Sequence, residues 1–137
     1  MKTRLLLAMI VGLWCAPAFA QNSSNQYARC KQAIQGSFLA DVSSMGGDAE
    51  MARQYGKYVI KGDTITSYSW DQSKKTWAKD FSVSYKLVYY YTDGYMTGYN
   101  IVFNSPYGYE VRMCTGDING DGKIDIWSSD SIFHTKQ

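Results

Sequence analysis

Histidine is almost missing from this sequence, and cysteine is scarce. The 137 residues contain one histidine, His134, and three cysteines. A Ser-His-Asp or Cys-His catalytic group needs a histidine beside its nucleophile, and His134 lies close to the C-terminal end, where we expect it to be exposed. One histidine and so few cysteines also cannot supply a tetrahedral zinc site of nitrogen and sulfur ligands. We therefore expect neither a catalytic triad nor a zinc centre.

No apolar run is long enough to cross a membrane. The run Leu5–Trp14 covers about ten residues, whereas a membrane-spanning helix needs about 20. It follows Lys2 and Arg4 and precedes small residues at 18–20, which is the pattern of a cleavable signal peptide. We predict that residues 1–20 are removed, that the mature protein is secreted or periplasmic, and that it has no membrane anchor.

A basic excess is missing as well. The whole sequence has 14 Lys and Arg against 12 Asp and Glu, and the loss of Lys2 and Arg4 with the signal peptide leaves 12 of each sign. Nucleic-acid binding depends on basic residues that neutralise phosphates, so we predict no nucleic-acid partner. The remaining chain, residues 21–137, suffices for a single domain with an ordinary hydrophobic core.

Two cysteines, Cys30 and Cys114, remain in the mature chain. In an oxidising compartment each can pair only with the other, and we predict a disulfide between them. Closing a loop of about 85 residues would stabilise the fold by about 4 to 5 kcal/mol in the chain-entropy model. Two free buried thiols are the alternative.

Hydrophobic residues alternate with a period of two from Lys57 onward. Before that point the pattern predicts a short helix over residues 27–35 that ends at Gly36, and a second over 49–55 capped by Asp48. Strands joined by short turns are predicted at residues 38–42, 57–60, 64–70, 81–91, 95–103, 107–113 and 124–126, with a further closing strand near Ile132 and Phe133.

Successive hairpins without parallel crossovers favour a mainly β fold. We predict an antiparallel meander of about seven or eight strands with a short N-terminal helix. The meander could fold as a sandwich or close as a small barrel, and we favour the barrel. This arrangement resembles the architecture of small lipocalin-like and calycin-like secreted proteins.

Oxygen-bearing side chains occupy alternate positions along residues 117–121, with a glycine at position six and a further Asp at position nine. Such oxygens can converge on a hard cation if the chain bends back sharply, which the glycine permits, while position seven offers its backbone carbonyl. The pattern predicts a calcium loop. Its ligands would be the side chains of Asp117, Asn119, Asp121 and Asp125 and the backbone carbonyl of Lys123.

The spacing resembles the D-x-N-x-D-G-x-x-D loops of EF-hands, dockerins and integrin-type propeller repeats. An EF-hand has a bidentate Glu at position twelve, where this chain has Ser128, so the propeller-type loop between two strands is the closer resemblance. Ser128 or Asp130 could complete the shell only if the chain folds back. The resemblance implies a structural calcium ion with a Kd on the order of 10⁻⁴ to 10⁻³ M. A metal-free hairpin turn is the alternative.

Aromatic residues are abundant, with 12 tyrosines in the chain. The alternation leaves Tyr68, Trp70 and Tyr90 off the inward face, and exposed aromatic residues suit recognition of a protein or sugar surface. We predict a secreted, non-catalytic, calcium-stabilised binding protein that docks a protein partner, of the inhibitor or toxin-neutralising type.

Two other functions stay open at this point. A lipocalin-like carrier would hold a small ligand in the barrel mouth, in a cavity lined by Tyr85, Tyr89, Tyr99 and Tyr109. A small hydrolase would need a pair of carboxylates. The only glutamates are Glu50 and Glu110, and nothing in the spacing selects a pair from the acidic residues.

Overall fold

Antiparallel strands make up most of the protein. The computed structural model describes residues 25–90, 96–128 and 132–137, so the predicted signal peptide lies outside the described residues. A helix covers residues 25–33, and it is followed by a 3-10 turn, η1 (Ser43–Met45), and a short helix, α2 (Ala49–Arg53). No helix within the described ranges is long and apolar enough to cross a membrane. The strands are β1 (Gly36–Ala40), β2 (Lys57–Lys61), β3 (Thr64–Asp71), β4 (Thr76–Ser84), β5 (Lys86–Tyr89), β6 (Met96–Asn104), β7 (Glu110–Gly116), β8 (Asp125–Trp127) and β9 (His134–Lys136).

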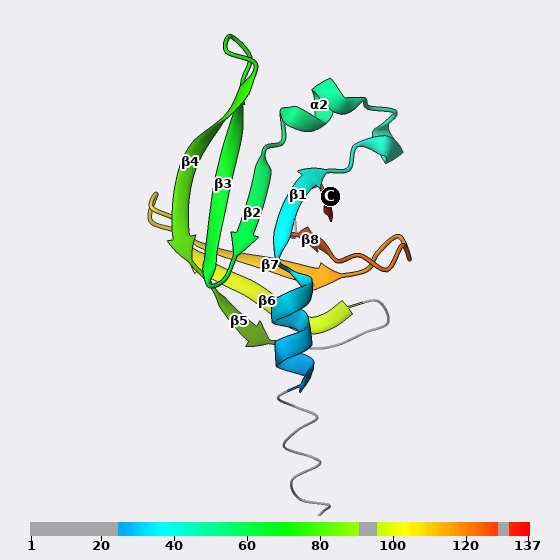
Figure 1. Ribbon diagram of the computed structural model, residues 1–137, viewed down its shortest axis with the longest axis vertical. Coiled ribbons are helices and arrows are strands. Elements are labelled where there is room, and N and C mark those ends of the chain that lie inside the picture. Colours follow the sequence, from blue (N-terminus) through cyan, green and yellow to red (C-terminus); the bar gives the residue numbers. More distant parts are fainter. Residues whose placement is uncertain (1–24, 91–95, 129–131) are drawn as a thin grey trace, which may run out of the picture.

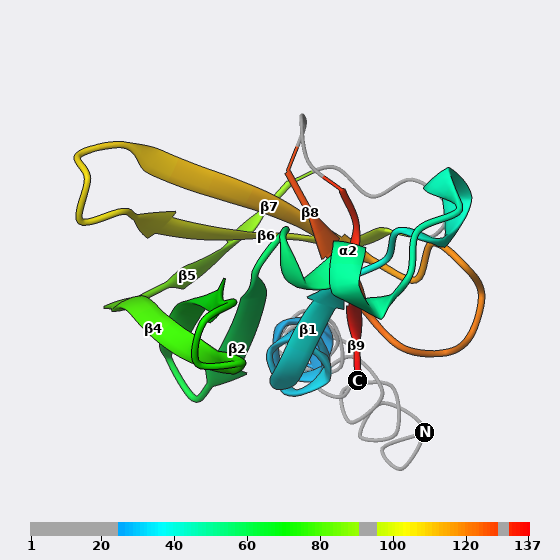
Figure 2. The same cartoon turned by 90° about the horizontal axis from the view of Figure 1, so that it is seen from above.

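All nine strands belong to one sheet with the order β4-β3-β2-β1-β9-β8-β7-β6-β5. Strands β1 to β4 stand side by side, and β6 and β7 run across below them, so that the sheet curls into a half-barrel (Figures 1 and 2). The predicted mainly β, antiparallel fold with a short N-terminal helix is confirmed. The sheet has nine strands rather than seven or eight, and within the described residues its edges β4 and β5 do not pair to close a barrel.

The curl depends on a break at Tyr85. The alternation predicted one strand over residues 81–91, but β4 ends before Tyr85 and β5 begins after it. Tyr85 is 6% exposed, its N–H donates to the carbonyl oxygen of Asp63 at 3.0 Å, and its hydroxyl donates to the carbonyl oxygen of Gly62. These contacts tie the corner to the β2–β3 turn, and the chain passes from one edge of the sheet to the other.

The concave face of the sheet holds the core. Its fully buried side chains include Phe38, Ile60, Ile101 and Ile126, and full burial of such a side chain contributes about 1.5 to 3 kcal/mol. The helix over residues 25–33 lies against one end of this face and adds further buried residues, among them Cys30. The opposite end of the concave face, called the mouth below, stays hollow.

The short second helix follows its predicted cap. The Asp48 side chain accepts a hydrogen bond from the N–H of Met51 at 3.0 Å, which satisfies one of the free donors of the first turn of α2. Gly36, just after the first helix, has a φ of 133°, a conformation that favours glycine. The start of α2 is therefore as predicted, whereas α2 ends at Arg53 rather than at residue 55 and the first helix covers residues 25–33 rather than 27–35.

Candidate metal site

The predicted calcium loop is the turn of a β-hairpin. It connects β7 to β8, and the hairpin closes on the pair Gly116 and Asp125. Gly120 and Gly122 have φ angles of 73° and 81°, in the left-handed region that other residues rarely adopt. The glycine at position six, Gly122, therefore supplies the bend that the pattern requires.

Three of the predicted ligands accept hydrogen bonds from backbone N–H groups of the loop itself. The carboxylate of Asp117 accepts from the N–H of Asp121 at 3.1 Å and from the N–H of Gly122 at 2.8 Å. The side-chain oxygen of Asn119 accepts from the same Asp121 N–H at 3.2 Å. Asp121 in turn accepts from the N–H of Lys123 at 2.8 Å. The side-chain oxygens of Asp117 and Asn119, at positions one and three, thus share one donor, the N–H of Asp121.

Asp125 differs from the other three because it is buried. Its residue is 1% exposed, and its Oδ2 accepts from the N–H of Ile118 at 2.9 Å. Its other oxygen, Oδ1, is buried and has no hydrogen-bond partner. Burial raises the pKa of Asp125, and the negative charges of Asp121 and Asp117 raise it further, against the lowering effect of backbone N–H groups. An ionised Asp125 is therefore costly in this loop without a nearby positive charge.

The loop brings the predicted side chains near one another without forming a finished metal cluster. Among the described residues, no three His, Cys, Asp or Glu side chains are gathered tightly enough to hold a metal ion. Ser128, at position twelve, lines the cavity at the mouth of the sheet, and Asp130 lies outside the described residues. The calcium ion therefore stays a prediction.

The predicted disulfide between Cys30 and Cys114 is not formed in the structure, where both are free cysteines. The Cys30 sulfur lies 3.6 Å from the Thr97 hydroxyl and 4.0 Å from the Thr115 hydroxyl. Because side chains alternate along β7, Cys114 points to the opposite side of the sheet from its neighbour Thr115. A disulfide needs both sulfurs on one side of the sheet. Burial raises the pKa of both thiols, which makes them poor nucleophiles.

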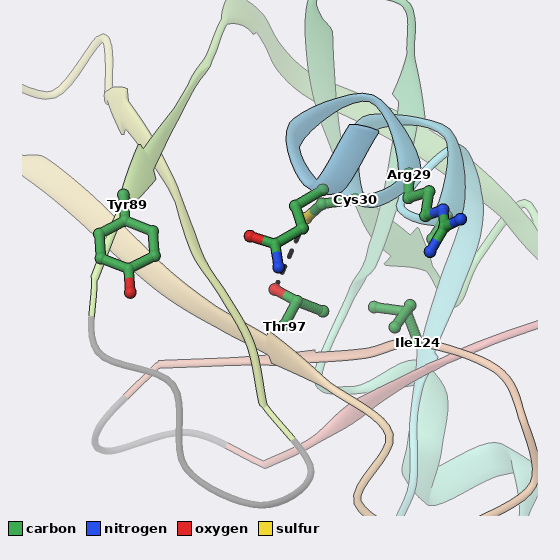
Figure 3. A pocket seen from close by; sticks show the side chains of 7 residues that line it. Arg29, Cys30, Tyr89, Thr97 and Ile124 are labelled. Carbon is green, nitrogen blue, oxygen red and sulfur yellow. Dashed lines mark hydrogen bonds between the residues drawn. The ribbon is translucent and has the colours of Figure 1, made fainter. Parts of the chain in front are cut away.

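A pocket of about 370 Å³ lies between the N-terminal helix, β5 and the calcium loop. Figure 3 shows Tyr89 across from the helix, with the hydrogen bond from Cys30 to Thr97 between them and Ile124 beneath Arg29. Because Ile124 belongs to the loop, the loop conformation sets one wall of this pocket.

A second cavity, of about 380 Å³, fills the mouth of the half-barrel. His134 lies at its base and is 6% exposed, so the expectation of an exposed histidine is wrong. Its ring nitrogens lie 3.2 Å from the carbonyl oxygens of Tyr55 and Ile132, and its ring packs against Tyr58 at 5.1 Å. Burial lowers the pKa of His134 and favours the neutral ring. The sequence pattern does not predict the burial of His134, because the strand that carries it, β9, has only three residues.

The tyrosines expected to line one barrel cavity are divided among three places. Tyr85 belongs to the core, Tyr89 lines the pocket beside the helix, and Tyr109 lines the mouth cavity. Tyr99 packs against both Tyr27 and Tyr89, with ring centroids 5.7 Å apart in each pair. A single tyrosine-lined chamber is therefore not present among the described residues.

The chain matches no protein-family model, no curated protein and no solved structure.

Proposed function

We propose that the protein is a secreted, non-catalytic binding protein whose β7–β8 hairpin is held by one calcium ion. The observation that supports the metal is the Oδ1 of Asp125, a buried carboxylate oxygen without a hydrogen-bond partner. Native proteins rarely leave such an oxygen unpaired. Its desolvation costs about 1 to 3 kcal/mol, and the cost is higher when the group is charged. A cation in the loop would offset that cost.

The charges around Asp125 favour a cation over a hydrogen-bond donor. Asp117 and Asp121 lie close enough to raise the pKa of Asp125, so three carboxylates share a loop of nine residues. Their mutual repulsion destabilises the hairpin at neutral pH. Calcium prefers oxygen ligands and carries two positive charges, so it would satisfy the unpaired oxygen and screen the repulsion together.

The hydrogen bonds already present do not exclude the ion. An ionised carboxylate has about four lone-pair sites, and those of Asp117 and Asp121 accept only backbone N–H groups. Each can keep its bond and still bind a cation. The loop would need only to tighten around the ion, which brings the side-chain oxygens of positions one, three, five and nine onto one centre.

Calorimetric titration with calcium tests this proposal. We expect one site with a Kd on the order of 10⁻⁴ to 10⁻³ M. Asp121→Asn should weaken binding strongly, whereas Asp71→Asn, at the end of β3 just before the turn to β4, should leave it unchanged. Absence of calcium binding to the native protein, or equal binding by the two variants, would contradict the proposal.

Docking of a protein partner is the role we propose for the scaffold. It is supported by Tyr107 and Tyr109, which are 68% and 57% exposed on the turn between β6 and β7. Exposed tyrosines combine a large apolar surface with a hydroxyl, and such residues are enriched where proteins meet. Affinity capture from the native secreted fraction should recover a protein partner with the native chain and lose it with Tyr107→Ser combined with Tyr109→Ser. Capture that is unaffected by both substitutions would reject this surface.

A small-ligand carrier is the second candidate, and the mouth cavity favours it. The cavity is lined by the apolar side chains of Val111, Met113 and Ile126 and by the aromatic rings of Tyr58 and Tyr109. Native mass spectrometry of protein purified from its source should show a bound small molecule if this role is correct. Met113→Trp, which fills the cavity, should remove that molecule and leave protein capture intact.

A further inference from the structure

A row of alternating basic and aromatic residues crosses the convex face of β2, β3 and β4. Lys57 pairs with Tyr68, and Tyr68 pairs with Lys79, so that a lysine stands on each side of the tyrosine. Trp70 pairs with Trp77 in the next outward row. We call these residues, together with Arg53 of α2, the basic aromatic face.

These side chains point away from the core. Ile60 and Ile65 are buried on the concave side, and each lies an odd number of residues from its outward neighbour on the same strand, Lys57 or Tyr68. Because strand side chains alternate, Lys57 and Tyr68 point outward. The lysines at the two ends of the row are two strands apart, which is about 10 Å at the usual spacing of strands.

Aromatic rings hold two of the cations in place. The Lys57 ammonium lies 4.9 Å from the centroid of Tyr68 and 5.0 Å from that of Trp77. The Arg53 guanidinium lies 4.6 Å from the centroid of Trp70. A cation–π contact restricts the position of a charge without cancelling it. The two positive charges are thus ordered before any ligand arrives.

Carboxylates do not neutralise this face. The two ion pairs of the described residues are Lys31 with Asp63 and Arg112 with Glu110, and neither includes a residue of the face. A register shift in β4 turns Asp80 toward the concave side, where Ser69 donates to it at 2.6 Å.

Two further acidic residues lie near the face, and neither forms an ion pair with it. Asp71 accepts from the N–H groups of Ser73 and Lys74 at 3.0 and 3.1 Å. Glu50, one turn before Arg53 on α2, forms no ion pair within the described part of the chain. The acidic residues at 117, 121 and 125 belong to the predicted calcium loop and not to this face.

A groove of about 460 Å³ adjoins the face where α2 approaches the sheet. Trp70 and Trp77 form one side of it, Arg53 contributes a charged group, and the small side chains of Ala49 and Ala52 leave the space open. A flat, partly apolar ring can pack against such indoles, while its ionised substituent reaches the guanidinium.

We propose that the basic aromatic face binds an acidic polysaccharide, a chain of sugar rings that carry carboxylate or sulfate groups. The C–H face of a sugar would pack on Trp70 and Trp77 beside the groove. The anionic groups of successive sugars would lie near Arg53, Lys57 and Lys79. This site is separate from the calcium loop and from the tyrosines proposed to dock a protein, so its failure and theirs are distinguishable.

Binding of defined oligosaccharides tests the proposal. The probes are oligogalacturonate, oligoalginate and a heparin hexasaccharide, followed by tryptophan fluorescence and calorimetry. The matched neutral probe is methyl-esterified oligogalacturonate of the same length, and oligodeoxythymidylate serves as an unrelated polyanion. We expect at least one acidic oligosaccharide to bind at least tenfold more tightly than both controls, with an affinity that falls as salt is added.

Variants locate the site. Lys57→Gln combined with Lys79→Gln, and separately Trp77→Phe, should each weaken binding at least tenfold, whereas Lys31→Gln, which removes a lysine already paired with Asp63, should not. Melting curves of the variants confirm that they fold. No binding of any acidic probe, equal binding of the ester or of the oligonucleotide, or unchanged binding by the folded face variants would each overturn the proposal.

Discussion

The β3–β4 and β7–β8 hairpins each have an aspartate beside the turn, Asp71 at the end of β3 and Asp125 at the start of β8, and they use these aspartates in opposite ways. In the β3–β4 hairpin, Asp71 accepts from the N–H groups of Ser73 and Lys74 and from the Ser73 hydroxyl, and these hydrogen bonds lower its pKa. In the β7–β8 hairpin, Asp125 is buried with one oxygen unpaired, and burial raises its pKa. The first carboxylate is stabilised by the hydrogen bonds of its own turn, whereas the second keeps one buried oxygen without a hydrogen-bond partner.

This contrast is the basis of our proposal that the second connection is a metal loop and the first a plain turn. Asp and Gly near a turn are common to both, because both residue types favour turn conformations. The distinguishing observation is an oxygen that the protein itself does not satisfy. Variants of the two hairpins test this difference.

Calcium should stabilise only the second hairpin. With calcium at ten to a hundred times its Kd, the expected gain in unfolding free energy is about 1.4 to 2.7 kcal/mol. Chelator should therefore lower the Tm of the native protein, Asp121→Ala should abolish that response, and Asp71→Ala should retain it. Calorimetric melting with and without chelator measures the effect. A native Tm that ignores chelator would remove the contrast between the hairpins.

Residues with a positive φ offer a second comparison between the two hairpins. Gly122→Ala should cost about 1 to 2 kcal/mol, because a Cβ disfavours its φ of 81° while no neighbouring atom lies within 4 Å. The β3–β4 turn holds a non-glycine residue, Lys75, at a φ of 51°. Lys75→Gly should relieve that strain and leave stability equal or slightly higher. Urea denaturation compares the two variants, and destabilisation by Lys75→Gly would contradict this account.

A change of pH should alter the contributions of Asp125 and Asp71 to the free energy of unfolding in opposite directions. The pKa of Asp125 is raised on folding, so the folded state binds more protons, and calcium-free stability should fall as pH rises from about 4 through the folded pKa. Asp125→Asn should remove this fall. For Asp71, whose pKa is lowered, the stabilising contribution is present above about pH 4 and is lost as pH falls through the folded pKa.

Denaturant midpoints of the native chain and Asp125→Asn, measured in chelator between pH 3.5 and 7, test the sign. The difference between the two proteins isolates Asp125 from the other carboxylates. A native midpoint that rises relative to the variant over this interval would mean that Asp125 is favourably paired when charged.

The smallest effect is expected at Asp71. Its side chain is exposed to solvent, so Asp71→Asn should lower the Tm only slightly and without any dependence on calcium. A matched melting scan of Asp71→Asn and the native chain, with and without calcium, provides the measurement. A large or calcium-dependent loss at this position would make the two hairpins alike.

The fold was largely predictable because alternation reports which side chains share a face of a sheet. It identified the β2–β3 hairpin, the long β6 and the hairpin around the calcium loop. It did not reveal the corner at Tyr85, since that break depends on contacts with Gly62 and Asp63, which lie more than 20 residues away. The curvature of the sheet depends on such distant contacts, so no local periodicity in the sequence predicts it.

The site was predicted less completely. The glycine bend and the oxygen pattern of the loop could be read locally, whereas the burial of Asp125 depends on the strands that pack around it. The disulfide prediction counted cysteines without asking which face each occupies, although the alternation itself places Cys114 outward. A closing strand was predicted near Ile132 and Phe133, but the burial of His134 was missed because β9 is too short to show a period.

The position of β9 between β1 and β8 has a consequence for the order of folding. Strands β1 to β4 pair as neighbours along the chain, and so do β5 to β8 across their turns, with β5 continuing directly from β4. The two groups become one continuous hydrogen-bonded sheet only through β9, residues 134–136. Until then β1 and β8 each present an open edge, and such edges invite pairing with other chains. Pairing of this three-residue strand therefore covers both of these edges at once.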